Sequence, residues 1–353
     1  MERPLLTFFV VAFNQERFIR EAATAALAQT YSPLQVILSD DCSRDRSFEI
    51  LRDVAQSYHG PHEVVLNRPP QNVGLANHLN RVMELAKGQF IVGSAGDDVS
   101  LPERTEVLWR AWEESGRQVC SLSSAMRLID EEGADYGLYE NPPPPFANDL
   151  LQMCRRGMPG VGGAAHAWDR RIFDVFGPLR PDVAYEDRAL PFRSLLLGRI
   201  AYVNQPLVLY RRHREAMTCQ TPARWTPAEH RRAEIKRASQ MECVFQQWLA
   251  DLAKAPHAPP QTTQVIEEVR AEMRFYGAMQ QEGFTARCRG FLAGLRAGVR
   301  WNYLARISLC SFFRPAFYWW LSRKGIHADF WTTTLNQRRE RRSAPRGGSG
   351  DAP

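Results

Sequence analysis

The stretch Phe90-Ile91-Val92-Gly93-Ser94-Ala95-Gly96-Asp97-Asp98 joins an apolar run to two adjacent carboxylates. The apolar run predicts a buried strand, and Leu101-Pro102-Glu103-Arg104 has the pattern of a helix start. The carboxylates therefore lie in a strand-to-helix loop, the place where open α/β sheets usually bind ligands. Because two buried carboxylates are costly, the pair favours a divalent cation or a polar cleft nearby, although capping of the next helix would also explain an Asp here.

The pattern around this loop predicts an α/β fold. Short apolar runs alternate with amphipathic stretches over the first two hundred residues, as in βαβ units around a mainly parallel sheet. The expected strands are residues 5–12, 36–39, 63–66 and 89–94, a longer and partly exposed strand over 119–129, and one or two closing strands over 200–210. The expected helices are residues 17–29, 45–58, 75–86, 169–176 and 186–197.

The texture of the sequence changes after residue 222, where strand patterns stop. Helices separated by Pro-rich or Gly-containing breaks are expected over 227–253, 263–281 and 285–307. We therefore expect a first domain over 1–222, a helical C-terminal region over 223–337 and a disordered basic tail over 338–353.

The composition is that of an ordinary globular protein, with 44% hydrophobic and 24% charged residues among 353. Seven cysteines without a CxxC pair argue against a disulfide framework and a Cys-rich zinc site, which fits a reducing cytoplasm. Residues 1–4 lead directly into a strand pattern, so we expect no secretion signal. The longest candidate for a membrane span, residues 307–321, is too short and contains Arg314, so we expect no transmembrane helix.

The net charge of +6 is unevenly placed, because residues 286–327 contain eight Arg or Lys and no Asp or Glu. Apolar residues and Trp301 accompany the arginines at helical spacing, a pattern typical of a helix lying on an anionic membrane surface. Packing on the first domain would explain the apolar residues equally well. No nucleic-acid recognition motif is present, so we expect no nucleic-acid partner.

Two further loops gather polar residues where predicted strands end. Asn14 follows the first strand, where it can cap the next helix or contact a ligand. Asp40 and Asp41 follow the second strand, and two carboxylates exceed what capping needs. Asn72-Val73-Gly74 precedes the helix over 75–86, and local structure alone would explain this turn.

Several short motifs follow one another in a fixed order. They are Phe13-Asn14, Gln29-Thr30-Tyr31, Asp40-Asp41-Cys42-Ser43-Arg44-Asp45, Asn72-Val73-Gly74, Ala86-Lys87-Gly88, and Gly96-Asp97-Asp98 with a Pro four residues on. This order resembles that of the family 2 glycosyltransferases over about residues 5–215. The resemblance implies the GT-A fold, Rossmann-like with a mainly parallel sheet and flanking helices, and inverting transfer from nucleotide-diphosphate sugars.

The resemblance also implies roles for the loop residues around the donor. Asp40 and Asp41 match the acidic pair that holds the pyrimidine base, usually uracil, and the backbone of Ala12 and Phe13 would line the same pocket. Asp97 is expected near the ribose. The residues expected to bind the nucleotide sugar are Ala12, Phe13, Asn14, Asp40, Asp41, Asn72, Gly74, Asp97 and Arg212.

A divalent cation, Mg²⁺ or Mn²⁺, is implied by the same resemblance. Asp98 matches the metal ligand, with the diphosphate bridging to the ion. The family usually has another Asp at the position of Ala95, so the expected hold on the metal is weaker here. His213 ends Tyr210-Arg211-Arg212-His213, which resembles a closing motif of the family, and would ligate the metal or contact a phosphate. A solvated basic turn is the alternative for this motif.

A catalytic base is expected after the donor motifs. Glu186-Asp187 resembles the acidic pair of the family in which the Asp is the base, so Asp187 is assigned that role and Glu186 a supporting or acceptor-binding role. Capping of the following helix is the alternative. The stretch Gly160-Val161-Gly162-Gly163 resembles the segment where sugars approach the backbone, although an ordinary turn would also use these glycines.

The sequence as a whole predicts a cytoplasmic, metal-dependent inverting glycosyltransferase, peripheral on the inner face of the membrane. It would move a sugar from a nucleotide-diphosphate donor, expected to be a UDP-sugar, to a hydroxyl of a glycan or lipid-linked glycan. A non-catalytic nucleotide-sugar binding paralogue is the alternative, because the Asp is missing at Ala95. A nucleotidyltransferase fits less well, because no Gly-rich loop follows the first strand.

Overall fold

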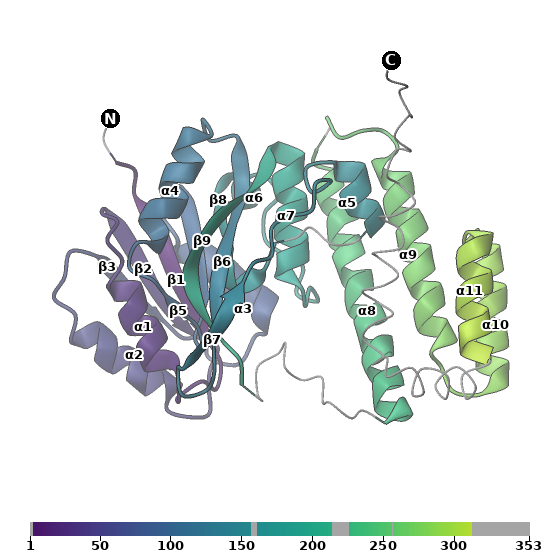
Figure 1. Ribbon diagram of the computed structural model, residues 1–353, viewed down its shortest axis with the longest axis horizontal. Coiled ribbons are helices and arrows are strands. Elements are labelled where there is room, and N and C mark those ends of the chain that lie inside the picture. The colour runs from purple at the N-terminus through teal and green to yellow at the C-terminus, as the bar shows by residue number, and fades with distance from the viewer. Residues whose placement is uncertain (1–2, 157–160, 214–225, 256, 313–353) are drawn as a thin grey trace, which may run out of the picture. The chain divides into compact units, whose positions relative to one another are not determined.

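The computed structural model describes residues 3–156, 161–213, 226–255 and 257–312 (Figure 1). The chain forms two compact units, which divide after Arg274. The first unit holds the sheet and the helices around it. The second unit begins at Phe275, and the two are described separately below.

A nine-stranded sheet forms the centre of the first unit, in the order β3-β2-β1-β4-β8-β6-β9-β5, with β7 paired to β6. The first four strands in this order are parallel: β3 (Glu63–Asn67), β2 (Leu34–Asp40), β1 (Leu6–Ala12) and β4 (Phe90–Ala95). The other strands are β8 (Ala167–Asp169), β6 (Val119–Ile129), β9 (Arg199–Arg211), β5 (Val99–Ser100) and β7 (Asp135–Tyr139). β8 is antiparallel to both β4 and β6, whereas β6 and β9 are parallel.

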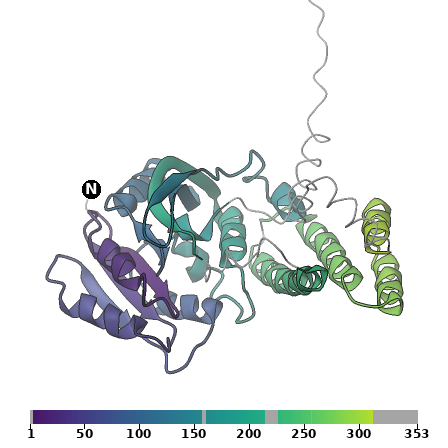
Figure 2. The ribbon, with the colours of Figure 1, turned by 60° about the horizontal axis from the view of Figure 1, so that its bottom comes forward.

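Helices cover both faces of this sheet, as Figures 1 and 2 show. One face packs against α1 (Ile19–Leu27), α2 (Ser47–Gln56) and α4 (Arg104–Glu114). The other packs against α3 (Leu75–Leu85), α6 (Arg171–Asp174) and α7 (Glu186–Leu197). The remaining helices of this unit are α5 (Leu150–Arg156), a short 3₁₀ helix (Gly163–Ala165), α8 (Pro227–Leu252) and most of α9 (Thr262–Met279).

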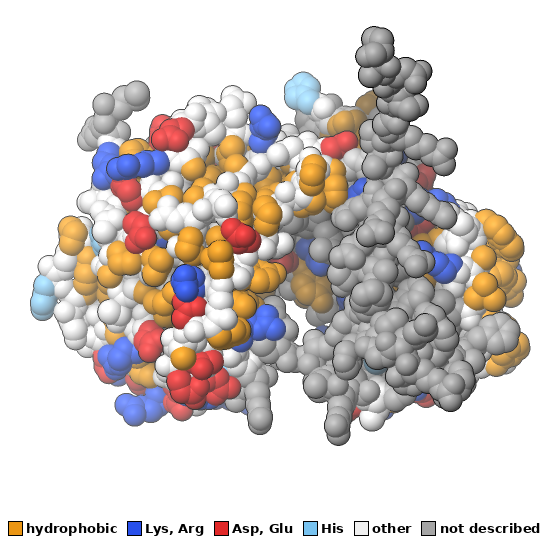
Figure 3. Space-filling view, in the orientation of Figure 1, with side chains coloured by type: hydrophobic (Ala, Val, Ile, Leu, Met, Phe, Trp, Pro, Cys, Tyr) orange, Lys and Arg blue, Asp and Glu red, His pale blue; other side chains and the backbone are white. Residues whose placement is uncertain are grey.

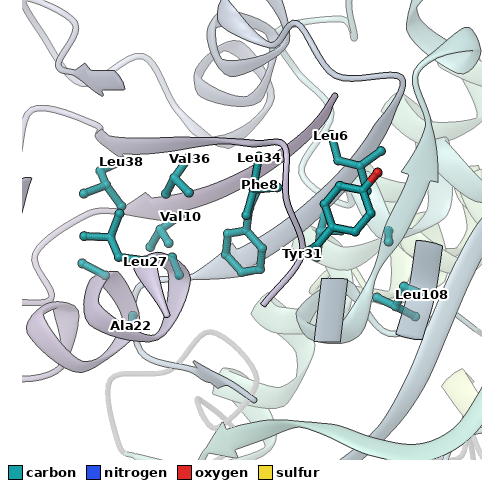
Figure 4. Packing of buried hydrophobic residues seen from close by; sticks show 14 of the residues in the cluster. Leu6, Phe8, Val10, Ala22, Leu27, Tyr31, Leu34, Val36, Leu38 and Leu108 are labelled. Carbon is teal, nitrogen blue, oxygen red and sulfur yellow. The ribbon is translucent and has the colours of Figure 1, made fainter. Parts of the chain in front are cut away.

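The strand β1 shows how the sequence builds the two cores. Successive residues of a strand point to opposite faces. Phe8 and Val10 belong to the cluster that contains Leu108 of α4, shown in part in Figure 4. Phe9 belongs to the other cluster, with Leu79 of α3. An uninterrupted apolar run is therefore needed here, because both faces of the strand are buried.

Three predicted elements differ from the structure. The strand over 119–129 is buried along most of its length, and not partly exposed, because β8 and β9 flank it. The helix predicted over 169–176 is shortened to α6, since Asp169 is the last residue of β8. The helix predicted over 285–307 is two helices, α10 (Phe284–Arg296) and α11 (Trp301–Phe312), with Gly298 at a left-handed φ of 68° between them.

The helix α8 belongs to the same compact unit as the sheet. Its Val244 and Trp248 share a buried cluster with Phe192 of α7 and Ile266 of α9. The first compact unit therefore extends to Arg274, beyond the boundary near residue 222 that the sequence texture predicted, because α8 buries its apolar face on α7. The predicted tail, 338–353, lies outside the described residues.

Among the described helices, none has the length and apolarity needed to cross a bilayer. Most of the candidate span over 307–321 lies beyond residue 312, outside the part of the chain that the structure describes.

Candidate active site

The loop after β2 is organised by its two carboxylates. Asp40 accepts hydrogen bonds from the backbone and hydroxyl of Ser43, and its Oδ2 lies 3.5 Å from Arg68 Nε. Asp41 accepts from the backbone N–H groups of Val73 at 2.9 Å and Gly74 at 3.0 Å. Both carboxylates are buried. They therefore join the loops that follow β2 and β3 into one rigid rim.

The loop after β1 is bound to the same rim. Asn14 has a left-handed φ of 54°, and its Oδ1 accepts a hydrogen bond from Arg44 N at 2.9 Å. Asn72 donates from Nδ2 to the carbonyl of Asp41 at 3.1 Å. Phe13 stays 45% exposed, next to the buried Ala12. An exposed aromatic face beside buried carboxylates is suited to stacking against a nucleobase.

The acidic loop after β4 separates its two carboxylates. Asp98 is 1% exposed, and its Oδ1 accepts a hydrogen bond from Arg211 N at 3.0 Å. Burial, with the neighbouring Asp97 charge, raises the pKa of Asp98 well above its usual range. Asp97 is partly exposed, and its Oδ2 lies 3.0 Å from His213 Nε2. The outward carboxylate is thus Asp97, paired with the imidazole at the end of β9.

The carboxylate of Asp97 fits a Mg²⁺ or Mn²⁺ ion, and the His213 imidazole lies beside it. Carboxylate oxygens suit these ions, and magnesium is commonly held by one or two carboxylates together with substrate phosphates. Within the described ranges, no group of three or more His, Cys, Asp or Glu side chains forms an all-protein cage. A site completed by a diphosphate is consistent with this arrangement.

Arg211 connects this loop to the hairpin between β6 and β7. This role of Arg211 was not predicted from the sequence. Its Nε donates to the carbonyl of Asp97 at 3.1 Å, and its Nη1 donates to the carbonyls of Asp130 and Glu131. Its neighbour Arg212 is exposed, so it is the arginine of the motif that faces solvent.

The acidic pair that begins α7 lies beside the 3₁₀ helix. Glu186 and Asp187 are partly exposed as residues, but Asp187 Oδ1 is buried and has no hydrogen-bond partner among the described residues. A Cβ atom at Gly163 would lie 3.0 Å from Glu186 Oε1 and 3.6 Å from the Asp187 Cβ, so glycine lets this backbone approach the pair. Of the predicted glycine stretch, Gly160 lies outside the described residues.

Burial raises the pKa of both carboxyls at the start of α7. Desolvation, with the adjacent Asp187 charge, raises the pKa of Glu186 to about 8. Desolvation also raises the pKa of Asp187, and the Arg188 charge opposes this effect. A carboxylate with a raised pKa is a stronger proton acceptor, which is the property that a general base requires.

The helix α8 supports α7 from behind. Tyr185, which precedes the acidic pair, donates from its hydroxyl to Gln240 Oε1 at 2.9 Å, and Trp248 Nε1 donates to the Arg188 carbonyl at 3.0 Å. Arg193 and Asp251 form a fully buried ion pair, with Nε to Oδ2 at 2.9 Å. These contacts were not predicted from the sequence. The sequence indicated them only by one charged residue inside each of two apolar helical stretches.

The rim, the acidic loop and the acidic pair of α7 all belong to the first compact unit. Arg104 connects the strand before the acidic loop to the segment beside the pair, because its Nη2 donates to the Gly93 carbonyl in β4 and to the Ala164 carbonyl beside Gly163. From the sequence, Arg104 was predicted only to belong to the helix start Leu101-Pro102-Glu103-Arg104, and these contacts were not predicted.

Comparison with known proteins agrees with this arrangement. Residues 7–175 match the family model of glycosyl transferase family 2. These residues form a family 2 glycosyltransferase domain. This domain is 31% identical over 130 residues to EpsE of Bacillus subtilis (strain 168), which carries the name of a glycosyltransferase. The match covers 37% of this chain and 46% of EpsE, so the chain spans about half the length of the curated relatives that it matches.

Solved structures identify the fold of the family 2 glycosyltransferase domain as GT-A. A crystal structure of residues 1–349 of S. aureus TarS in complex with UDP-GlcNAc aligns with a TM-score of 0.57 and 14% identity, over 92% of this chain and 93% of that one. The mannosyltransferase PcManGT of Pyrobaculum calidifontis, in complex with GDP-Man and Mn²⁺, aligns with a TM-score of 0.51 and 18% identity, over 90% of this chain and 83% of that one. The predicted fold class is confirmed.

Proposed function

We propose that this protein transfers a sugar from a nucleotide-diphosphate donor to an acceptor hydroxyl with inversion, and that Asp187 is the general base. The observation that carries the proposal is the buried, unpartnered Oδ1 of Asp187 beside Gly163. A buried acceptor atom left without a donor is costly, so a substrate hydroxyl that donates to it would be bound favourably. Glu186 would support this carboxylate or bind the acceptor.

The reaction requires one proton acceptor and one leaving-group site. The acceptor oxygen would form its bond to the anomeric carbon while its proton passes to the Asp187 carboxylate. The bond between the anomeric carbon and the diphosphate oxygen would break on the opposite face of the sugar, and its electron pair would leave with the diphosphate. Arg212, which is exposed, would contact that diphosphate by a charge-assisted hydrogen bond.

For the donor, we propose that the nucleobase binds at the rim formed by Asn14, Asp40, Asp41 and Asn72. Phe13 would stack against the base. TarS was solved with a UDP-sugar and the Pyrobaculum enzyme with a GDP-sugar, so relatives of this fold accept both bases. We propose a UDP-sugar, because Asp40 and Asp41 match the acidic pair that usually holds uracil in the family that the sequence resembles.

For the metal, we propose Asp97 and His213 as the protein ligands, which revises the predicted roles. Asp98 was predicted to bind the metal and Asp97 to lie near the ribose. The buried position of Asp98 favours a structural role, because its carboxylate already accepts a hydrogen bond from the end of β9. A bound divalent cation would neutralise the charge that develops on the diphosphate.

The acceptor and the membrane association are also proposals. In the second unit, α10 and α11 expose large apolar side chains, between 43% and 69%: Phe284, Leu292, Leu295, Trp301 and Leu309. Arg289 and Arg296 on α10 are also exposed. Apolar side chains among arginines support binding to an anionic membrane surface, where a lipid-linked glycan would be available. Figure 3 shows hydrophobic side chains over these helices.

The proposed function is tested by measuring nucleotide release from UDP-, GDP- and dTDP-sugars with Mg²⁺ or Mn²⁺. We expect Asp187→Asn to reduce transfer by about 10²-fold to 10⁴-fold while donor affinity is retained. Asp182→Asn, which alters an exposed residue of the same loop, is the matched control. Donor binding without release across the panel would instead favour the non-catalytic binding protein, the alternative that the missing Asp at Ala95 supports.

Membrane binding is tested separately with sedimentation of anionic and neutral lipid vesicles. We expect the protein to bind the anionic vesicles, and the double variant Arg289→Glu/Arg296→Glu to lose this binding. Arg20→Glu/Arg52→Glu makes the same charge change on exposed positions of the first unit. If both double variants bind equally well, the surface of α10 is not the membrane contact.

A further inference from the structure

The strand β7 exposes apolar side chains on both of its faces. Tyr136 is 54% exposed, Leu138 53% and Tyr139 41%. Within the described part of the chain, β7 is hydrogen-bonded only to β6, so it is an edge strand. Exposed aromatic residues on an edge strand are a liability for aggregation, and such a patch usually marks a binding surface. The strand therefore requires an explanation beyond packing.

The register of β7 separates its two tyrosines. Tyr139 lies opposite Met126 of β6, and residues opposite each other in an antiparallel pair share a face of the sheet. Leu138 lies opposite the exposed Arg127. The register shifts between Gly137 and Asp135, so Tyr136 lies in a bulge and has no partner on β6. Tyr139 is therefore placed on the Met126 face by its pairing, whereas Tyr136 lies in the irregular part of the strand beyond Gly137.

The face of the sheet that carries Tyr139 also carries Met126, which connects it to the segment beside the proposed base Asp187. Met126 is buried together with Ala165, at the end of the 3₁₀ helix, and its methyl carbon lies 3.7 Å from the position of a Cβ at Gly162. A Cβ built at the next residue, Gly163, would lie 3.0 Å from Glu186 Oε1 and 3.6 Å from the Asp187 Cβ, so this backbone lies close to the acidic pair. Met126 therefore lies between Tyr139 and the segment around Gly163, which is close to the proposed base Asp187.

The other end of the same hairpin is bound to the donor side of the site. The carbonyls of Asp130 and Glu131 accept hydrogen bonds from Arg211 Nη1, and Arg211 also donates to the carbonyl of Asp97. The hairpin is thus fixed at one end to the proposed metal ligand, while its Tyr139 end lies near the base. A molecule that enters between the two would meet the face of Tyr139.

We propose that Tyr139 is an acceptor-binding residue whose ring packs against the apolar C–H face of a sugar ring in a carbohydrate acceptor. This inference rests on the proposed function, since it places the acceptor hydroxyl at Asp187. A pyranose has an apolar face and a polar edge, and a tyrosine ring offers a matching apolar face with a hydroxyl at its tip. Binding energy from such a contact would orient the hydroxyl for transfer.

The experiment compares Tyr139→Ala with Tyr136→Ala and Tyr139→Phe. Tyr136→Ala removes an exposed ring from the bulged part of the same strand, away from the Met126 pair, and Tyr139→Phe keeps the ring. The probes are cellobiose, maltose, diacetylchitobiose and mannobiose, and their binding is measured by saturation-transfer NMR in the presence of UDP and Mg²⁺. Release of nucleotide from the donor to water is measured for each variant in the absence of disaccharide.

We expect at least one disaccharide to bind the unaltered protein, and Tyr139→Ala to weaken this binding about threefold to tenfold. Tyr136→Ala and Tyr139→Phe should retain it, and donor hydrolysis should be equal in all four proteins. Equal binding by both alanine variants, or no binding of any of the four disaccharides, would overturn the inference. A change in donor hydrolysis confined to Tyr139→Ala would also overturn it, by placing the ring at the donor. Absence of donor hydrolysis from every protein would count against the proposed function instead.

Discussion

Replacing Asp251 tests whether α8 is an integral part of the domain that carries the base. Arg193 and Asp251 are 0% and 1% exposed at their side chains, and two hydrogen bonds of 2.9 Å and 3.0 Å join them. Asp251→Ala leaves the guanidinium buried without its counter-ion. Loss of one partner of a buried pair costs about 3–5 kcal/mol. We expect the lower part of that range, because Arg193 also donates to the backbone carbonyls of Gly177 and Pro178.

The same pair predicts that a double replacement is much better tolerated. Burial raises the pKa of Asp251 although Arg193 opposes this, so the desolvation of the carboxylate is only partly offset by its partner. Replacing both residues by apolar side chains of similar volume, Arg193→Met/Asp251→Leu, removes both desolvation costs. The double variant should therefore be more stable than Asp251→Ala alone.

Urea unfolding followed by tryptophan fluorescence measures these free energies, since Trp248 lies on α8 beside the pair. Glu267→Gln is the matched control, because it breaks the exposed ion pair with Arg270, and such surface pairs contribute roughly 0–1 kcal/mol. If Asp251→Ala and Glu267→Gln lower the free energy of unfolding equally, the Arg193–Asp251 pair does not hold α8 to α7. In that case α8 is not an integral part of the first unit.

Three further predictions follow from the site. The pKa of Glu186 is raised from 4.5 to about 8, so this group contributes stability that is complete below pH 4.5 and is lost as the pH rises through about 8. Glu186→Gln should therefore flatten the fall in melting temperature over that interval. An unchanged dependence of melting temperature on pH would contradict the raised pKa. Asp97→Ala should abolish the stimulation of donor hydrolysis by Mn²⁺, whereas Asp98→Asn should keep it, because the amide oxygen can still accept the hydrogen bond from Arg211 N; the reverse pattern would restore the roles predicted from sequence. Gly163→Ala would place a methyl group 3.0 Å from Glu186 Oε1, and we expect a lower kcat with an unchanged circular dichroism spectrum. Unchanged kcat would show that the backbone does not need to approach the pair.

The sequence located the loops that carry the proposed donor residues, because each of these loops follows a buried strand. An apolar run that ends in Asp or Asn locates both the strand and its loop, and the structure places Asp40, Asp41 and Asn14 on one rim. Which of two adjacent carboxylates points inward depends on the loop backbone, so the sequence could not distinguish Asp97 from Asp98. The strands β5 and β8, with two and three residues, are too short for a periodic signal.

The contacts across α7 and α8 were unpredictable for a different reason. Arg193 and Asp251 are 58 residues apart, and only the packing of the two helices brings them together. A charge inside an apolar helical stretch indicates a buried partner, but it does not identify that partner. The same limitation applies to Arg211, whose backbone acceptors at Asp97, Asp130 and Glu131 lie 80 to 114 residues earlier in the chain.

The site is divided between two parts of the chain, and this division bears on specificity. The family 2 match ends at residue 175 and contains the nucleotide rim, the acidic loop and Tyr139. The proposed base Asp187, His213 and the supporting helix α8 all lie beyond it. A relative that matches this chain only up to residue 175 therefore shares the segment of the proposed donor residues and not the segment of the proposed base. A variant that changes acceptor choice without affecting donor hydrolysis should thus be sought on α7, on β7 or in the loop between α6 and α7, and not at the rim.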